Sequence, residues 1–471
     1  MESLTNLGLG VCRAQIGLDA DPHPDANDPL YVADEYHGLS CNPERNNDDG
    51  TANVCGGWVV MVPNVIPGEL IRCRVFRNYP KHSDADLLEV IEPSPHRVVP
   101  RCELAGICGG CQYQHVAVPE QRVWKRRQVS DLFQRLGKLT LGADLPEVSP
   151  TMGTDEVYHY RSKITPHYDA PKENPIGILE IRKIGFKEKM SRRIVDVPHC
   201  HIATESINAR LTEVREVRFA DAVLGRLKRP KKGATLLLRE SDGGVITTDN
   251  NEYVTSTVGD IEFRYKAGNF FQNNPHVLPL MLDQVVEAAI QPNGRGEAMT
   301  HLIDCYCGSG LFCLGASSKF DTCVGIEVND RAVEEATENA HRNGITNCKF
   351  VAASAEAIFK SNDAVEVTHT STGETRSELV REFPRDTTAV VIDPPRKGCS
   401  VEFLAQLNEF SPQRVVYMSC DPATQARDAR IIADAGYDLV SVKPIDLFPQ
   451  TRHIECLAVF ERRKAVADID S

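Results

Sequence analysis

Cys420 is the residue whose type and position most clearly allow covalent chemistry. It directly follows residues 415–418, an apolar run with β-branched and aromatic members that predicts a buried strand. Asp421 and Pro422 end that run, so the thiol is expected at the carboxyl end of a strand, where open α/β sheets bind ligands. The structural alternative is a small buried side chain, which is favoured when this segment is read alone.

A glycine turn further up the chain offers a place for a nucleotide. Residues 302–305 form an apolar run, and Gly308 and Gly310 follow before a predicted helix. Glycines in such a turn let the backbone approach a ligand closely. The next apolar run ends in Glu327, whose carboxylate suits the two ribose hydroxyls of an adenosine.

The turn departs from the nicotinamide-dinucleotide fingerprint, because Cys313 stands where the third glycine of that motif is expected. S-adenosylmethionine is therefore the favoured ligand, and a glycine turn without a ligand is the alternative. A third apolar strand ends at Asp393, and the prolines after it predict a rigid loop beside the site. Arg396 closes this loop and offers a cation for a phosphate or a carboxylate.

Three cysteines, Cys102, Cys108 and Cys111, lie within ten positions, with two glycines between the last two. Such spacing allows their thiolates to converge on one metal centre, which needs a fourth ligand from elsewhere. Cys200 is favoured over His115 as that ligand, because an all-thiolate set suits an iron–sulfur cluster or zinc. Spacing alone leaves the choice between the two metals open, and reduced structural cysteines are the alternative.

The composition limits the class of protein. A chain of 471 residues is too long for one ordinary hydrophobic core, so several domains are expected. Its 16 cysteines, in a chain without a secretory signal, favour a reducing compartment. That compartment is expected to be the cytoplasm, and an organelle is left open. No run of about 18 apolar residues predicts a membrane helix. A net charge of −13 argues against a protein that coats nucleic acid nonspecifically. Basic runs such as residues 226–232 support local phosphate contacts, with a solvated surface as an equally weighted alternative.

The elements predict an α/β protein of several parts. Strand–loop–helix repeats in the last two hundred residues indicate a Rossmann-like parallel sheet, interrupted by a surface insertion at about 361–388. The expected segments are a weakly ordered acidic leader (1–29), a small β-barrel (30–95, with an expanded loop at 40–57), a central α+β domain with the cysteine set and basic patches (96–265), the Rossmann-like domain (266–465) and a tail (466–471).

Four motifs together resemble the RNA (uracil-5-)-methyltransferases, the S-adenosylmethionine-dependent enzymes that make 5-methyluridine in tRNA and ribosomal RNA. The motifs are Asp304-x-Tyr306-Cys307-Gly308-x-Gly310, Asp393-Pro-Pro-Arg396, Ser419-Cys-Asp-Pro-Ala-Thr-x-Ala-Arg427-Asp428 and Phe448-Pro-Gln-Thr-x-His453-x-Glu455. The resemblance runs from about residue 31 to residue 463, and the 30–95 segment is similar to the TRAM domain, an OB-like RNA-binding barrel.

The resemblance implies a role for each matching position. Cys420 is implied as the nucleophile and Glu455 as the base. The implied ligands of S-adenosylmethionine are Gln272, Tyr306, Glu327 and Asp393, beside Gly308 and Gly310 of the turn, and the implied ligands of a [4Fe-4S] cluster are Cys102, Cys108, Cys111 and Cys200. Leu311 departs from the family, in which many members have asparagine, so one side-chain contact to the cofactor is in doubt.

The reaction explains why these residue types are needed. Carbon 5 of uracil is a poor nucleophile until a thiolate adds to carbon 6, and a base must later remove the proton from carbon 5. Because a stacked base cannot react, the target uridine is expected to flip into the pocket. The methyl transfer itself requires no electron, so a cluster would be structural or would position RNA.

The expected partner is RNA. The protein is expected to be a monomer and to have no membrane partner. Cluster-bearing relatives mostly modify ribosomal RNA, so that substrate is favoured, with a tRNA (uracil-5-)-methyltransferase as the alternative. A second alternative is a non-catalytic RNA-binding or chaperone protein on a degenerate methyltransferase fold. Leu311 favours it, whereas the presence of both Cys420 and Glu455 argues against it.

Overall fold

The computed structural model describes residues 3–4, 9–14, 58–228, 231–356, 359, 364–368 and 375–463. It divides the chain into two compact units, Met1–Gln121 and Arg122–Ser471, where the sequence predicts divisions after residues 95 and 265. Most of the predicted leader, the predicted loop at 40–57 and the predicted tail lie outside the described residues.

The first unit is built on a five-stranded sheet in the order β1-β2-β3-β5-β4. The segment predicted as a small β-barrel (30–95) contains the strands β3, β4 and β5, whereas the closed TRAM barrel stays a prediction. The strands are β1 (Ser3–Leu4), β2 (Leu9–Ala14), β3 (Trp58–Pro63), β4 (Leu70–Asn78) and β5 (Ser83–Glu92).

The start of the chain differs from its prediction as a weakly ordered leader over 1–29. Residues 9–14 form β2, which pairs antiparallel with β3 from Leu9 opposite Pro63 to Ala14 opposite Trp58. The reason is a long-range one, because the free edge of β3 needs hydrogen-bond partners that the local composition of the leader does not reveal.

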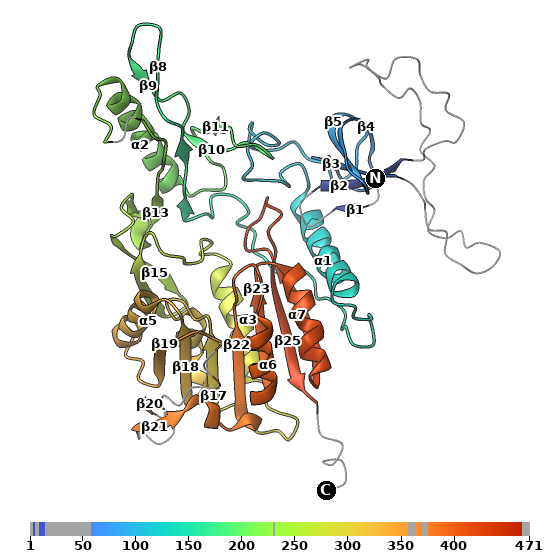
Figure 1. The fold of residues 1–471 in the computed structure, drawn as a ribbon, viewed down its shortest axis with the longest axis vertical. Helices are drawn as coiled ribbons and strands as arrows, with labels where there is room; N and C mark the ends of the chain where they lie inside the picture. Colours follow the sequence, from blue (N-terminus) through green and yellow to red (C-terminus); the bar gives the residue numbers. More distant parts are fainter. Residues whose placement is uncertain are drawn as a thin grey trace, which may run out of the picture. The chain divides into compact units, whose positions relative to one another are not determined.

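Helix α1 (Val118–Arg135) spans the division between the units. Beyond it lies a region of short strands around α2 (Glu205–Val223), which packs on β9, β13 and β14 (Figure 1). The strands of this region are β6 (Lys163–Ile164), β7 (His167–Tyr168), β8 (Lys172–Glu173), β9 (Leu179–Glu180), β10 (Gly185–Lys187), β11 (Ile194–Asp196), β12 (Ala234–Thr235), β13 (Leu238–Glu240), β14 (Ile246–Thr247), β15 (Tyr253–Val258) and β16 (Ile261–Lys266).

The predicted Rossmann-like sheet is confirmed as seven strands in the order β19-β18-β17-β22-β23-β25-β24. Strands β19 to β23 of this order are parallel, and β25 runs antiparallel to both of its neighbours. The strands are β17 (His301–Cys305), β18 (Thr322–Glu327), β19 (Cys348–Ala352), β22 (Thr388–Ile392), β23 (Arg414–Ser419), β24 (Tyr437–Ile445) and β25 (Glu455–Arg462).

Helices cover both faces of this sheet, because successive strand residues point to opposite sides. Val415 and Tyr417 of β23 pack in the core beneath α1, α6 and α7, whereas Val416 and Met418 pack in the core beneath α3 and α4 (Figure 1). The helices are α3 (Leu278–Ile290), α4 (Leu311–Ala316), α5 (Asp330–Arg342), α6 (Val401–Phe410) and α7 (Pro422–Asp434), with short 3-10 turns at Asp242–Gly244, Ser317–Lys319, Val380–Glu382 and Arg385–Thr387.

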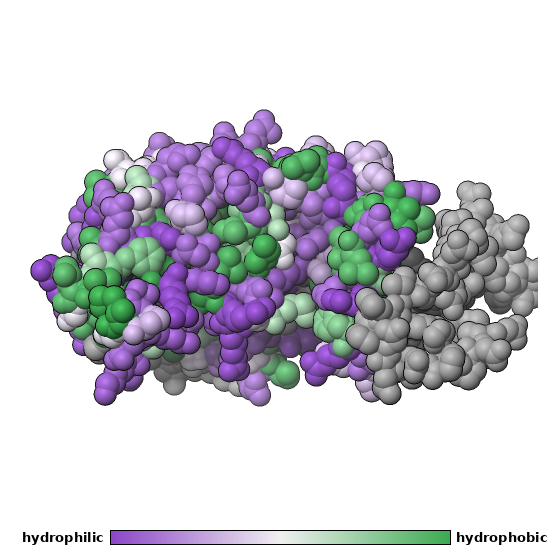
Figure 2. All heavy atoms as spheres, turned by 90° about the horizontal axis from the view of Figure 1, so that it is seen from above, coloured by the Kyte–Doolittle hydropathy of each residue, from purple (hydrophilic) through white to green (hydrophobic). Residues whose placement is uncertain are grey.

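The segment predicted as a surface insertion at 361–388 contains a hairpin of β20 (Ala364–Thr368) and β21 (Thr375–Leu379), between β19 and β22 in the chain. Within the described ranges, no helix combines the length and apolar character that crossing a bilayer requires. Hydrophilic side chains predominate on the face shown in Figure 2, where hydrophobic ones form small, separate patches.

Candidate active site

A pocket of about 790 Å³ lies at the edge where the parallel strands of the sheet end. The chain order reverses between β17 and β22, and such a switch point is where open α/β sheets bind ligands. The pocket gathers seven of the eight residues predicted for catalysis and cofactor binding. These are Gln272, Tyr306, Gly308, Glu327, Asp393, Cys420 and Glu455.

The two predicted catalytic residues come from neighbouring strands. Because β25 runs antiparallel to β23, it begins where β23 ends, and the register pairs Ser419 with Cys456. Cys420 and Glu455 therefore flank this pair at one edge of the sheet; Cys420 is half-buried and Glu455 is 4 % exposed. The buried side-chain amide of Gln425 holds both strand ends, because it donates to the carbonyls of Tyr417 and Cys456, each at 2.9 Å.

The pocket raises the pKa of one thiol and two carboxyl groups. Burial raises the pKa of the Cys420 thiol to about 11, with a further rise from the carboxyl groups of Glu455 and Asp393. Burial likewise raises the pKa of Glu455 to about 8 and that of Asp393 to about 7. Arg396 opposes the rise at Cys420 and Glu455, since a cation favours the ionised forms. A cationic ligand would act in the same direction.

The loop that carries Cys420 continues into α7. Asp421 caps this helix, because its carboxylate accepts a hydrogen bond from the amide of Ala423 at 3.1 Å, and Pro422 occupies the first turn. The thiol precedes a helix N-terminus, whose dipole favours a thiolate. Thr424 of the helix donates to the carbonyl of Arg396 at 3.1 Å and so ties α7 to the loop after β22.

Asp428, a motif residue without an evident task from sequence, has a structural one. It is buried and accepts hydrogen bonds from the Tyr417 hydroxyl and the Cys399 amide, both at 2.8 Å. Gly398 passes so close that a Cβ atom there would lie 2.6 Å from the Asp428 carboxylate, and its φ of +76° also favours glycine. Asp428 thus holds the strand before Cys420 against the loop that begins at Asp393.

The glycine turn has an unusual backbone. Tyr306, Gly308 and Gly310 all have positive φ, at 68°, 54° and 92°, and the value for Tyr306 is strained for a residue with a side chain. Glu327 spans the turn and the next strand, because it accepts hydrogen bonds from the amides of Gly308 at 3.1 Å and Asn329 at 2.9 Å. Gly310 does not line the pocket but begins α4, and the side chain of Leu311 packs on the core beneath α3 and α4.

Glu335 of α5 lines the pocket and is a residue that sequence reasoning missed. It is 3 % exposed and accepts hydrogen bonds from the amide of Lys266, the side-chain amide of Asn269 and the hydroxyl of Ser309, between 2.8 and 3.1 Å. Its surroundings of glutamate, threonine and asparagine read as an exposed helix face. Only the packing of α5 against β16 turns this carboxylate inward.

The motif that ends in Glu455 is held by a buried ion pair. Lys125 of α1 and Asp446 have fully buried side chains with 2.6 Å between their charged atoms, and the Lys125 ammonium also donates to the carbonyl of Phe448 at 3.4 Å. Tyr160 donates to the carbonyl of Pro449 at 2.9 Å. Burial lowers the pKa of His453 to about 4, and nearby cations add to this effect, so the imidazole is neutral at neutral pH.

The predicted cluster cysteines belong to different units. Cys102, Cys108 and Cys111 lie in the first unit and Cys200 in the second, and all four are half-buried. The amide of Gly110 donates to the Cys108 sulfur at 3.5 Å, a contact that suits a thiolate ligand.

Comparisons with known proteins identify the family. A family model described as tRNA (Uracil-5-)-methyltransferase matches residues 220–463. The chain belongs to this family. A tRNA (uracil(54)-C(5))-methyltransferase of Schizosaccharomyces pombe is 38% identical over 425 residues, which cover 88% of this chain and 75% of that protein. The enzyme of the same name from Saccharomyces cerevisiae is 30% identical, covering 86% of this chain and 69% of that protein.

The tRNA (uracil-54, C5)-methyltransferase of Pyrococcus abyssi, solved with S-adenosyl-L-homocysteine, shares the fold. It has a TM-score of 0.60 and 20% identity, with 88% of this chain and 98% of that chain covered. The protein is accordingly an S-adenosylmethionine-dependent RNA (uracil-5-)-methyltransferase, with the Rossmann-like fold predicted from its sequence. The part played by each pocket residue does not follow from membership alone.

Proposed function

We propose that this protein forms 5-methyluridine in tRNA, with Cys420 as the nucleophile and Glu455 as the base. The observation that carries the proposal is the pairing of β23 with β25, which brings a thiol and a buried carboxyl group to one edge of one pocket. A thiol and a base are the two groups that methylation at carbon 5 of uracil requires from the protein.

Cys420 acts first. Its sulfur forms a bond to carbon 6 of the flipped uracil, and the electron pair moves through the ring so that carbon 5 becomes nucleophilic. The N-terminus of α7 and the Arg396 guanidinium favour the thiolate, and both oppose the burial that raises the pKa of the free thiol to about 11. Bound S-adenosylmethionine supplies the electrophilic methyl group that carbon 5 attacks.

Glu455 completes the reaction. After carbon 5 has received the methyl group, the carboxylate removes the proton that carbon 5 still carries, and the bond from carbon 6 to the Cys420 sulfur breaks. The thiolate is the leaving group, so the enzyme returns to its starting state apart from the proton on Glu455. A pKa of about 8 makes this carboxyl group a stronger base than an ordinary glutamate.

The residues of the pocket fit S-adenosylmethionine. The Glu327 carboxylate can accept hydrogen bonds from ribose hydroxyls, because its two backbone hydrogen bonds leave lone pairs available. Gly308 lets the ligand approach the turn closely. Gln272, Tyr306 and Asp393 would contact the remainder of the molecule. A sulfonium cation suits a pocket in which Asp393 and Glu455 are buried carboxyl groups.

We favour tRNA, at the position that corresponds to uridine 54, because two fungal relatives bear that activity in their names and one is 38% identical. The preference for ribosomal RNA, predicted from the cysteine set, competes with this proposal. Both substrates are loops of structured RNA from which a uridine can be flipped, so the chemistry of the pocket serves either.

A methylation assay tests the proposal. The full chain is incubated with labelled S-adenosylmethionine and either unmodified tRNA transcript, the same transcript with cytidine at position 54, or unmodified ribosomal RNA. Label is expected only in the first tRNA, and 5-fluorouridine at that position should give an adduct that survives denaturation. Label in ribosomal RNA alone would overturn the choice of substrate and leave the reaction intact.

Cys420→Ala tests the nucleophile, with Cys73→Ala on β4 of the other unit as its control. Activity should fall by at least about a thousandfold, because the covalent route is lost. The control should retain full activity. An adduct formed by Cys420→Ala would show that another residue attacks the base.

We also propose a [4Fe-4S] cluster on Cys102, Cys108, Cys111 and Cys200, with zinc as the competing metal. Four half-buried thiols and the amide contact to the Cys108 sulfur support the assignment, which the expected reducing cytoplasm would permit. Anaerobically purified protein should contain iron and acid-labile sulfide in equal amounts and absorb visible light. Colourless protein that contains zinc would remove the cluster.

A further inference from the structure

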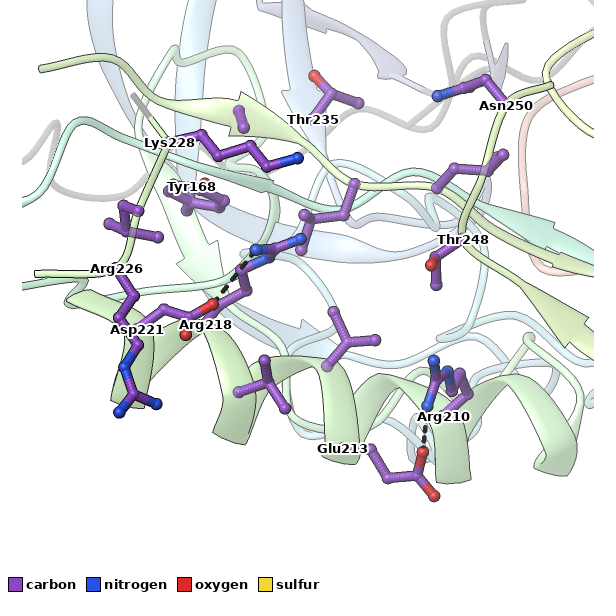
Figure 3. A pocket seen from close by; sticks show the side chains of 16 residues that line it. Tyr168, Arg210, Glu213, Arg218, Asp221, Arg226, Lys228, Thr235, Thr248 and Asn250 are labelled. Atoms are coloured by element: carbon purple, nitrogen blue, oxygen red, sulfur yellow. Dashed lines mark hydrogen bonds and ion pairs between the residues drawn. The ribbon is translucent and has the colours of Figure 1, made fainter. Parts of the chain in front are cut away.

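A second pocket, of about 770 Å³, lies between α2 and the strands β7 and β12, and none of its lining residues belongs to the methyltransferase sheet. Figure 3 shows α2 along one side and the strands along the other. The residues that line it are Tyr168, Arg210, Glu213, Val214, Val217, Arg218, Asp221, Arg226, Leu227, Lys228, Ala234, Thr235, Leu236, Leu237, Thr248 and Asn250.

The interior of this pocket is apolar and includes an aromatic ring. Tyr168, Leu227 and Leu236 are each 9 % exposed, and they belong to the core under α2. Val217 of α2 also lines the pocket and is 56 % exposed. Such a hollow offers flat apolar surface that a planar ligand could cover.

The rim is polar and carries an excess of positive charge. Four cations and two acids line the pocket, and the acids are engaged, because Glu213 pairs with Arg210 at 2.6 Å and Asp221 pairs with Arg218 at 3.5 Å (Figure 3). The side chain of Lys228 has no ion pair with any described residue, and it reaches over the hollow in Figure 3. Its charge is available to an anion from outside the protein.

Polar groups that could read a base edge also line the pocket. They are Thr235 of β12 and, after β14, Thr248 and Asn250, and all three are exposed (Figure 3). The Thr235 hydroxyl also contacts His167 Nδ1 at 2.7 Å. Hydroxyl and amide side chains supply both donors and acceptors. An apolar interior with hydrogen-bonding groups and a cation around it matches the base and the phosphate of one nucleotide.

We propose that this pocket binds an unpaired nucleotide of the substrate RNA, with its base in the hollow and its phosphate at Lys228. Sequence-specific recognition of RNA usually targets such bases, which pack on aromatic or guanidinium planes. The proposal rests on RNA being the substrate, and it assigns α2 and β12 a role in holding RNA while Cys420 reacts at a different nucleotide. An acidic protein segment would satisfy the cations but would not need the depth of the hollow.

Filling the hollow is the first test. Val217→Trp places a large side chain in the pocket, and Val223→Trp is its control, since Val223 lies on the same helix, is 52 % exposed and does not line the pocket. Val217→Trp should raise the Kd of the full-length protein for unmodified tRNA about tenfold, as expected for one lost stacked base. The KM for tRNA should rise with it while kcat stays unchanged.

The charge is tested by salt dependence. Lys228→Gln should reduce the slope of log K against log salt concentration by roughly 0.7 to 0.9, the value for one phosphate contact, whereas the control Lys319→Gln in the 3-10 turn after α4 should not. AMP and UMP, each at millimolar concentration, serve as probes for a free nucleotide. Neither should displace tRNA that is present at the same concentration as the protein.

Several outcomes would overturn the inference. Equal Kd values for Val217→Trp and Val223→Trp would show that no base enters the pocket. An unchanged salt slope for Lys228→Gln would show that the lysine faces something other than RNA, such as an acidic protein. Competition by AMP or UMP would assign the pocket to a free nucleotide. Wild-type protein that binds tRNA normally but methylates no RNA would instead contradict the proposed function.

Discussion

The two pockets of the second unit have nearly the same volume, about 790 and 770 Å³, but their charged groups are arranged in opposite ways. The active-site pocket lies at strand ends, where Glu455 and Asp393 are buried beside a thiol and their pKa values rise to about 8 and 7. The pocket beside α2 has its charges on the rim, in exposed pairs such as Arg210 with Glu213.

This difference in burial separates a pocket suited to catalysis from a pocket suited to binding an anion. Burial away from water raises the pKa of a carboxyl group toward neutral pH, and the group becomes a stronger base. A guanidinium or ammonium group that stays in water keeps its charge and can exchange ions for a phosphate. We therefore expect changes in the first pocket to affect kcat and stability, and changes in the second to affect RNA affinity.

The largest effect is expected from Glu455→Gln. The amide cannot accept the carbon 5 proton, so kcat should fall by about 10² to 10⁴. Attack by Cys420 precedes this step, so a covalent complex with unmodified RNA should accumulate and be visible on a denaturing gel. Glu461→Gln, at the other end of β25, is the control and should turn over normally. Normal release of RNA by Glu455→Gln would assign the base elsewhere.

The buried ion pair that holds the Glu455 motif and the exposed pair on the rim of the second pocket should differ in their contribution to stability. Asp446→Asn leaves the buried Lys125 ammonium without its counter-charge and should lower the free energy of unfolding by about 3 to 5 kcal/mol. Glu213→Gln breaks a pair at a similar distance but in water, and should cost at most about 1 kcal/mol. Urea unfolding of both variants measures this difference, and equal losses would contradict the expected effect of burial on an ion pair.

The stability of the fold should also depend on pH through Glu455. In the folded protein Glu455 holds its proton up to a pKa of about 8, whereas in the unfolded chain it loses it near 4.5. Between these values the folded state binds more protons, so this residue lowers stability as the pH rises and has no further effect above about 8. Each unit by which the pKa is raised corresponds to about 1.4 kcal/mol.

Glu455→Gln removes this dependence. Its melting temperature relative to the wild type should therefore increase between pH 5 and pH 8.5, and differential scanning calorimetry at both values can detect the change. A constant difference would mean that the carboxyl group is ordinary in the folded state.

Much of the active site was predictable because its residues are marked by local chemistry. A strand pattern followed by Cys420, by Asp393 or by the glycines of the turn is visible within a few residues. Glu335 was not predictable, since its burial depends on α5 packing against β16. The strand formed by residues 9–14 was also missed, because its partner β3 lies more than forty residues further along the chain.

The sequence alone determined the α/β class, the alternation of strands and helices in the last two hundred residues, the chemical type of the active-site residues and the family resemblance. These follow from hydrophobic periodicity and from short motifs, which are properties of neighbouring residues. The tertiary structure decided that β25 runs antiparallel to β23, so that Glu455 meets Cys420. It also decided which carboxyl groups are buried and which cations remain on a rim, since burial depends on contacts between segments far apart in the chain.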